Sequence, residues 1–422
     1  MRSSIASRCI QLTLLAISTL ASARVGSAQS ESEVHVSPTG PVRTVAEGLR
    51  RVRNGGRVVV EAGRYREPVI VVTRPVELVG KGWPTLDGEG SHEILLVAAD
   101  DVTVRGLAFT NVSTSYVEDR AAIRVKESRK CNIVDNRLDH VFFGIYLAKS
   151  AACRIERNDL RAANTTETSS GNGIHLWSTR DVVIANNRIT GFRDGLYFEF
   201  VHEANVYNNL STKNLRYGLH FMYSDDCEYR RNIFRNNGSG VAVMYTHRVA
   251  MIGNTFENNW GAAAYGLLLK EISDAHVERN IFRGNTTGLV ADGANRIEAL
   301  SNDFIENGWA IRLDASTVDG RIALNNFAGN TFDIASNSQN PTTAVAGNYW
   351  DTYRGYDLNR DGVGDVPFHP VRLFSMIVER NEPALILLRS GIVQLLDAAE
   401  RVFPILTPEG LADAHPAMRR IK

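Results

Sequence analysis

A repeat of about 22 residues runs through the middle of this 422-residue chain and constrains its fold more than any other feature. In each repeat a small residue precedes an apolar, a variable and a second apolar residue, as in Gly218-Leu219-His220-Phe221. The repeats begin at Ala122, Gly144, Gly173, Gly195, Gly218, Gly240, Gly266, Gly288 and Ala310. Apolar residues two positions apart indicate short strands that bury one face.

A column of asparagines accompanies these strands, each just before a second short apolar segment. Its members are Asn136, Asn158, Asn187, Asn208, Asn232, Asn254, Asn280, Asn302, Asn325 and Asn348. Glycine and asparagine tolerate the left-handed backbone that tight turns require, and stacked asparagines can pass hydrogen bonds from rung to rung. The sequence therefore predicts an all-β fold, a single-stranded right-handed parallel β-helix over residues 29–350.

The two ends of the β-helix have different sequence signals. Near the N-terminus, Thr44 and Glu47 form a capping box and predict a capping helix that ends at Gly55-Gly56. An Asp/Gly-rich loop region is expected over 351–382, followed by a C-terminal amphipathic helix and tail over 383–422. This helix, from Pro383 to Phe403, either caps the last rung or docks on a partner.

The first 28 residues are typical of a secretory signal peptide. A weakly basic start precedes an apolar run from Cys9 to Ala21, and small residues offer cleavage after Ala23 or after Ala28. The protein is therefore expected outside the cytoplasm, and in a bacterium this means the periplasm. The formal net charge of the chain is +0, which does not suggest nucleic acid as a partner.

The variable residues between the apolar positions point outward, so equivalent residues of successive rungs should form ladders on the surface. One such face gathers histidines and methionines beside Tyr146, Trp177 and Tyr197. The candidate copper ligands on this face are His175, His220, Met222, Met244, His202 and His247. Imidazole and thioether groups together suit copper, in particular Cu(I). Two alternatives remain: an aromatic-rich docking face, or methionines in the core if the register is shifted by one residue.

A second candidate metal site lies near the C-terminal end of the predicted coil. Asp357, Asn359, Asp361 and Asp365 space oxygen ligands as in the first part of a Ca²⁺ loop. Phe368 stands at loop position 12, so the segment is not an EF-hand. A turn held by side-chain to backbone hydrogen bonds is the alternative.

Three cysteines remain after the signal peptide is removed: Cys131, Cys153 and Cys227. Each lies five residues before the asparagine column, where other rungs have valine, and this indicates a small inward position. Buried thiols are therefore the favoured interpretation. Cys131 and Cys153 lie on adjacent rungs, close enough for a disulfide by distance, although parallel in-register geometry is unfavourable for one.

The C-terminal part carries the most specific motif. Residues 347–351 (Gly-Asn-Tyr-Trp-Asp) and 355–367, with the tail around 388–404, resemble the closing signature of the NosD family. The resemblance implies a periplasmic copper-binding protein of nitrous oxide reductase maturation. It also implies an ABC transporter permease with its ATPase, a periplasmic copper chaperone and nitrous oxide reductase itself as partners. The family pattern indicates no ligand positions.

An enzyme is the competing class, because many parallel β-helices act on polysaccharides. A polysaccharide lyase or epimerase needs paired carboxylates, or a base beside cations, on neighbouring rungs, and a carbohydrate-binding β-helix is a third option. Glu199, Asp225 and Asp226 form no evident pair with lysine or arginine in the sequence. The sequence therefore predicts an accessory protein for copper delivery and no catalytic residues.

Overall fold

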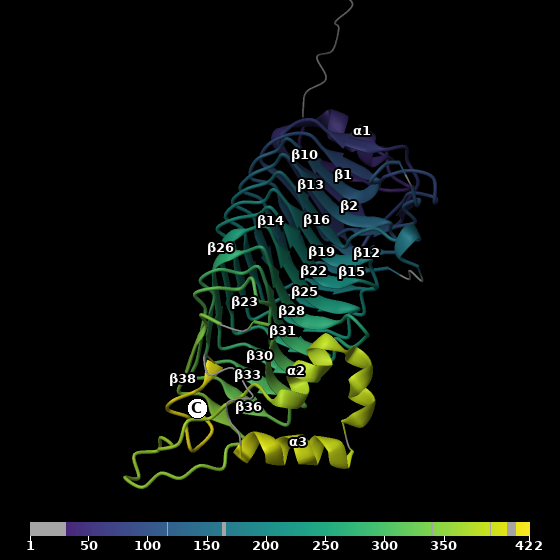
Figure 1. The fold of residues 1–422 in the computed structure, drawn as a ribbon. Helices are drawn as coiled ribbons and strands as arrows, with labels where there is room; N and C mark the ends of the chain where they lie inside the picture. Colours follow the sequence, from purple (N-terminus) through teal and green to yellow (C-terminus); the bar gives the residue numbers. More distant parts are fainter. Residues whose placement is uncertain (1–30, 116, 163–165, 339–340, 389, 403–410) are drawn as a thin grey trace, which may run out of the picture.

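Short parallel strands wind into a solenoid of about 14 turns in the computed structural model (Figure 1). The structure describes residues 31–115, 117–162, 166–338, 341–388, 390–402 and 411–422, so the predicted signal peptide lies outside the described residues. Each complete turn contributes one strand to each of three parallel sheets, which have 14, 12 and 13 strands. The predicted parallel β-helix is therefore confirmed.

The three sheets run the length of the coil. Sheet 1 comprises β1 (Glu31–Val36), β2 (Val52–Glu61), β5 (Val76–Lys81), β8 (Val102–Arg105), β11 (Asn132–Val134), β14 (Arg154–Glu156), β17 (Val183–Ala185), β20 (Asn205–Tyr207), β23 (Glu228–Arg230), β26 (His247–Ile252), β29 (Ser273–Glu278), β32 (Glu298–Leu300), β35 (Arg321–Ala323) and β38 (Ala344–Ala346). Sheet 2 comprises β4 (Ile70–Val72), β7 (Leu95–Val97), β10 (Ala121–Lys126), β13 (Phe143–Ala148), β16 (Ile174–Trp177), β19 (Asp194–Glu199), β22 (Tyr217–Met222), β25 (Ser239–Met244), β28 (Tyr265–Lys270), β31 (Thr287–Asp292), β34 (Trp309–Leu313) and β37 (Phe332–Ser336). Sheet 3 comprises β3 (Arg64–Tyr65), β6 (Thr85–Asp87), β9 (Ala108–Thr110), β12 (Arg137–Asp139), β15 (Asp159–Arg161), β18 (Arg188–Thr190), β21 (Leu210–Thr212), β24 (Ile233–Arg235), β27 (Thr255–Glu257), β30 (Ile281–Arg283), β33 (Asp303–Ile305), β36 (Asn326–Ala328) and β39 (Tyr349–Trp350).

The interior of the coil contains columns of like residues. The apolar pair of each repeat points inward, as Leu219 and Phe221 of β22 show, and both are fully buried. On sheet 3 a stack of aromatic rings fills the second half of the core. Its members are Phe234, Phe256, Phe282, Phe304, Phe327 and Trp350, with ring centroids 4.1–5.6 Å apart.

The predicted asparagine column forms a buried hydrogen-bond ladder at the turn between sheets 1 and 3. Each backbone N–H and side-chain Nδ2 donates to the Oδ1 of the asparagine one rung further on, as Asn136 does to Asn158 at 3.0 and 3.1 Å. Asn208 was the wrong member, because Asn209 occupies the ladder and Asn208 is exposed. Asn187 on the rung before and Asn232 on the rung after both form their ladder hydrogen bonds with Asn209, one residue later than the predicted Asn208.

A second ladder, not predicted, lies at the turn between sheets 3 and 2. It consists of Asn214, Asn237, Asn259, Asn285, Asn307 and Asn330. Each of these residues follows a member of the first ladder by five positions, so the sequence contained the signal. The ladder begins at Asn214, whose side-chain oxygen accepts the N–H of Phe192.

The N-terminal end is covered by α1 (Val45–Arg51), which packs on β1, β2 and β4. The Thr44 side chain accepts the N–H of Glu47, which confirms the N-cap. The helix ends at Arg51 and not at Gly55-Gly56, because the chain turns into β2, where Arg57 and Val58 pair in register with β5.

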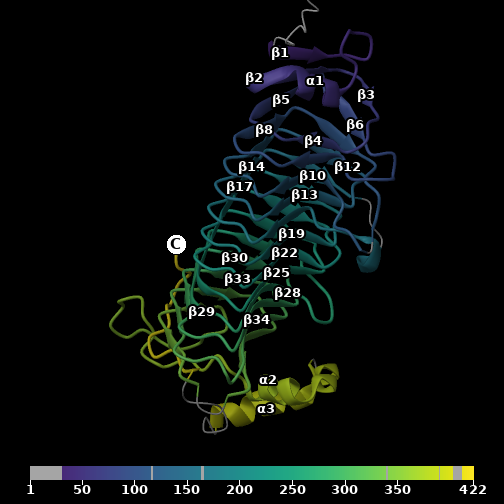
Figure 2. The ribbon, with the colours of Figure 1, turned by 90° about the horizontal axis from the view of Figure 1, so that it is seen from above.

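The C-terminal end has a helical hairpin in place of one long helix. It consists of α2 (Leu373–Arg380), the 3₁₀ segment η2 (Glu382–Leu387) and α3 (Gly391–Val402), at the end of the coil opposite α1 (Figures 1 and 2). Proline at the start of η2 and glycine at the start of α3 divide the region predicted as one helix from Pro383 to Phe403. Phe403 itself lies outside the described residues. Where the sequence predicted a loop, Phe374 of α2 packs on Phe332 of β37, the last strand of sheet 2.

The tail returns from the hairpin to the end of the coil, where Leu411 is buried. The Asp413 carboxylate accepts the N–H groups of Gly347 and Asn348, the Asn348 side chain and the indole N–H of Trp350. This carboxylate therefore takes the place of the next asparagine at the end of the first ladder.

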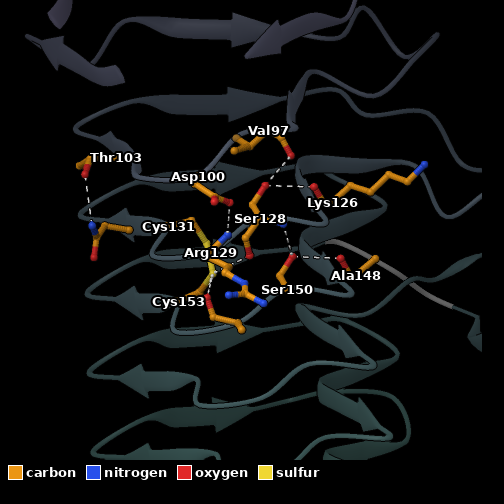
Figure 3. Close-up of a disulfide and its surroundings, with 12 residues drawn as sticks. Val97, Asp100, Thr103, Lys126, Ser128, Arg129, Cys131, Ala148, Ser150 and Cys153 are labelled. Atoms are coloured by element: carbon orange, nitrogen blue, oxygen red, sulfur yellow. Dashed lines mark hydrogen bonds between the residues drawn. A yellow bond between two sulfur atoms is a disulfide. The ribbon is translucent and has the colours of Figure 1, made fainter. Parts of the chain in front are cut away.

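Cys131 and Cys153 form a disulfide between adjacent rungs (Figure 3). Their Cα atoms are 4.6 Å apart, within the range a disulfide spans. The favoured interpretation of two buried thiols was therefore wrong for this pair, since in-register rungs bring the two sulfur atoms together inside the coil. Cys227 is a free, buried thiol, as expected.

Candidate functional site

The outer face of sheet 2 carries the residues predicted to bind copper. Pairing of β13, β16, β19 and β22 places Tyr146, His175, Tyr197 and His220 in one column. Their ring centroids are 4.4, 4.7 and 5.1 Å apart along the column. The predicted register is therefore correct, and the methionines are not in the core.

Burial of the two histidines differs from the expectation of an open surface. His175 and His220 are only 9% and 8% exposed, because the tyrosine rings of neighbouring rungs cover them. Burial lowers the pKa of His175 to about 3, and the positive charges of Arg193 and Arg124 act in the same direction. Burial likewise lowers the pKa of His220 to about 4, although the nearby Asp194 carboxylate opposes the shift. Both imidazoles are therefore neutral at neutral pH.

Hydrogen bonds fix the tautomer of His220. Its Nδ1 lies 3.3 Å from a guanidinium nitrogen of Arg216, which can only donate, so Nδ1 accepts and the ring proton is on Nε2. Arg216 is held by a bidentate pair with buried Asp194, at 3.0 and 2.6 Å. The Nε2 atom is buried and has no hydrogen-bond partner among the described residues. In this geometry His220 offers an N–H and not a lone pair.

The second outward column contains the two methionines. Met222 of β22 pairs in register with Met244 of β25, and Glu199 and Lys270 precede and follow them. Both methionine side chains are partly exposed. Adjacent parallel strands lie about 4.8 Å apart, so the two thioethers are neighbours on the surface.

His202 and His247 occupy a third column, where His202 lies just before β20 and His247 is the first residue of β26. Both are exposed, and the Nδ1 of His247 lies 3.2 Å from the Asp225 carboxylate. The six predicted residues thus form three columns: buried histidines, partly exposed methionines and exposed histidines. Among the residues that the structure describes, no three or more His, Cys, Asp or Glu side chains are grouped as metal ligands. The individual copper ligands stay a prediction.

An exposed aromatic ladder next to the methionines was missed. Phe200, Tyr223 and Tyr245 directly follow Glu199, Met222 and Met244, and their rings stack with centroids 5.5 and 5.2 Å apart. Each is more than a third exposed. An aromatic residue at the same position of three successive rungs was the signal in the sequence.

The predicted calcium loop is held by its own hydrogen bonds. The Asp357 carboxylate accepts the N–H groups of Asp361 and Gly362, and Asp365 accepts that of Leu358. Asn359 and Asp361 each accept a backbone N–H within the loop as well. These bonds match the alternative of a self-supported turn, and calcium binding by this loop stays a prediction.

These features define a class of protein: a parallel β-solenoid with a Met/His/aromatic outer face. Among solved structures, the coil is similar to a mannuronic acid-specific polysaccharide family 6 lyase from human gut microbiota (TM-score 0.56, 14% identity, 78% of this chain and 89% of that one). It is also similar to the catalytic unit of a GH87 α-1,3-glucanase from Streptomyces thermodiastaticus (TM-score 0.54, 13% identity, 76% and 66%). At these identities the likeness concerns the fold alone.

Sequence comparison shows which proteins the chain is similar to. Residues 161–355 match the family model described as "Periplasmic copper-binding protein (NosD)". A relative from Pseudomonas aeruginosa named "Probable ABC transporter binding protein NosD" is 29% identical over 87% of this chain and 90% of that protein. A relative of the same name from Stutzerimonas stutzeri is 26% identical over 85% and 86%. The chain is therefore similar to NosD proteins over most of its length, and the resemblance that its C-terminal motif indicated is confirmed.

Within the described residues, no helix has the length and apolar character needed to cross a membrane.

Proposed function

We propose that this protein is a periplasmic accessory protein of an ABC transporter and that it binds copper and passes it on. In this proposal the copper comes from a periplasmic chaperone and serves the copper–sulfide centre of nitrous oxide reductase. The family description supports the compartment and the metal, and the names of both relatives support the transporter. The protein acts by binding and not as an enzyme.

The observation that carries the copper proposal is the in-register pair Met222 and Met244 on the outer face of sheet 2. Thioether sulfur is a soft ligand that prefers Cu(I), and two thioethers without a thiolate hold the ion weakly enough for release. His220 can join them only if its Nε2 loses the proton that the contact with Arg216 keeps there. In this proposal the methionine pair is therefore the site that binds Cu(I) first.

Cu(I) titration of the purified protein against a chromophoric chelator tests this proposal. Met222→Ala and Met244→Ala should each weaken Cu(I) binding by about tenfold or more, since each removes one of two soft ligands. Met418→Ala is the matched control, because this partly exposed methionine lies in the C-terminal tail. Equal affinity of all three variants and the wild type would remove the methionine pair from the mechanism.

The helical hairpin is the surface we assign to the permease. Ile386, Ile392 and Leu395 are 89%, 52% and 69% exposed, which is unusual for aliphatic side chains in a folded protein. The hairpin is tied to the coil by Arg312 and Glu379, 2.9 Å apart, and by the contact of Phe374 with Phe332. A partner on the hairpin would therefore be linked mechanically to the last rungs.

Co-purification with the transporter tests this assignment. Leu395→Glu places a charge on the exposed face of α3 and should strongly reduce recovery of the permease, while the coil stays folded. Leu358→Glu, at a residue that is 79% exposed outside the hairpin, is the control and should leave recovery unchanged. Normal recovery with Leu395→Glu would show that the permease docks elsewhere.

A further inference from the structure

A cavity of about 330 Å³ lies on the outer face of sheet 2, on rungs before the methionine pair. Phe143, His175 and Tyr197 contribute aromatic rings to its lining. Arg193 and Glu199 add charged groups from the rung of β19. Met222 and Met244, which carry the copper proposal, do not line this cavity.

Two long connections converge on the cavity. Most turns from sheet 3 to sheet 2 are short, as at 140–142 and 191–193. After β9 and after β15 the same turn is extended, and Asp119 from the first connection and Ser170 from the second both line the cavity. Loops that lengthen beside one concavity of a regular scaffold are where such folds carry binding sites.

The charged groups of the cavity are incompletely paired. Arg193 Nε is buried without a hydrogen-bond partner among the described residues, and its contact with Asp194 is long, at 3.7 Å. Asp194 is instead engaged by Arg216 at 2.6 Å. The Asp119 and Glu199 carboxylates form no ion pair or hydrogen bond with any other described residue. A buried donor on Arg193 thus faces the same space as the exposed Asp119 and the partly exposed Glu199 carboxylates. A buried donor normally has a hydrogen-bond partner in a folded protein, whereas water can hydrate the two carboxylates.

A ligand that both donates and accepts hydrogen bonds meets the Arg193 donor and the two carboxylates together. Hydroxyl groups do both, whereas an anion would meet the two carboxylates and a cation would meet Arg193. The aromatic lining offers apolar ring faces to the C–H side of a flat ring, and the volume lies within the range of small-molecule sites. We propose that this cavity binds a neutral saccharide, with one sugar ring on Tyr197 and its hydroxyls on Arg193 and Glu199.

Isothermal titration calorimetry of the mature protein with neutral trisaccharides tests the proposal. Cellotriose, maltotriose and the N-acetylglucosamine trimer serve as probes, and the mannuronate trimer is the acidic comparison. At least one neutral probe should bind saturably and more tightly than mannuronate. Tyr197→Ala and Arg193→Gln should each weaken that binding by about tenfold, the usual effect of losing a stacked ring or a hydrogen bond to a charged group.

Tyr223→Ala is the control, because Tyr223 belongs to the exposed aromatic ladder and does not line the cavity. Its binding should equal that of the wild type. Glu199→Gln keeps the shape of the side chain and guards against a folding defect in Tyr197→Ala; it should also weaken the binding. Absence of saturable binding to every neutral probe, tighter binding of mannuronate, or binding unaffected by the Arg193 and Glu199 substitutions would overturn the proposal. Met222→Ala should leave saccharide binding unchanged, so the copper and saccharide proposals can fail separately.

Discussion

Two aromatic columns run along the same coil, one inside sheet 3 and one outside sheet 2. The inner column consists of five phenylalanines and ends with Trp350, and its neighbouring rings are fully buried and 5–19° from parallel. The outer column alternates tyrosine with histidine, and its rings are tilted by 41–80°. Charged residues surround the outer column, including Arg193, Arg216 and Asp194.

The difference shows where this fold separates stability from function. Uniform rings fill the interior because each rung meets an identical rung above and below, so one packing solution serves all of them. The outer column has no such constraint, and its residues differ from rung to rung. Variety in a column that the fold does not need for packing indicates that those residues serve recognition.

Removing one ring from each column is the strongest test of this contrast. Phe282→Ala should lower the free energy of unfolding by roughly 3–5 kcal/mol, because it leaves a cavity between Phe256 and Phe304, whose centroids are 4.7 Å from that of Phe282. Tyr197→Ala should lower it by roughly 1–2 kcal/mol, because solvent can reach the space that the ring leaves. Chemical denaturation of both variants gives the comparison. Equal losses would mean that the outer column is part of the packed scaffold.

A smaller effect is expected for the pH dependence of stability that His175 of the outer column causes. His175 has its ordinary pKa near 6.5 when unfolded and a pKa of about 3 when folded, so between these values the unfolded chain binds more protons. Its contribution to stability is therefore complete above pH 6.5 and declines as the pH falls toward 3. Relative to the wild type, His175→Gln should gain roughly 1–2 kcal/mol on going from pH 7 to pH 5.

Urea unfolding of the wild type and His175→Gln at both pH values measures this difference. His202→Gln, at an exposed position on the third column, is the control and should follow the wild type at each pH. If the free energy of unfolding changed equally for His175→Gln and the wild type between the two pH values, His175 would become protonated in the folded protein as readily as in the unfolded chain. The outer column would then be more open than its burial indicates.

The repeat made the coil and its register predictable from sequence, because successive rungs have their inward and outward residues at equivalent positions. Phase alone did not distinguish Asn208 from its neighbour Asn209, since two asparagines are adjacent there and only burial selects one. For the same reason the Cys131–Cys153 disulfide was undecided: the repeat places the residues on adjacent rungs, but side-chain rotamers bring the sulfur atoms together.

The candidate site was less predictable than the coil. Periodicity correctly placed His175 and His220 on the outside, but an outward residue can still be buried by the residues one rung above and below. Those neighbours are about 22 positions away in the sequence, and their size, not their polarity, decides the exposure. The C-terminal hairpin lies outside the repeat, so its helix limits had no periodic support and the break before α3 was missed.

Asp413 ends the first asparagine ladder, and its negative charge also affects the electrostatics at this end of the coil. Every amide of the first ladder donates toward the C-terminal rungs, so the side-chain dipoles add head to tail and leave a partial positive charge at the last rung. There the Asp413 carboxylate receives the N–H and the side-chain amide of Asn348. A neutral amide in this place would leave its own N–H donors without a partner at the end of the ladder. The Asp413 carboxylate has no such donors, so the tail that carries it closes the exposed end of the coil.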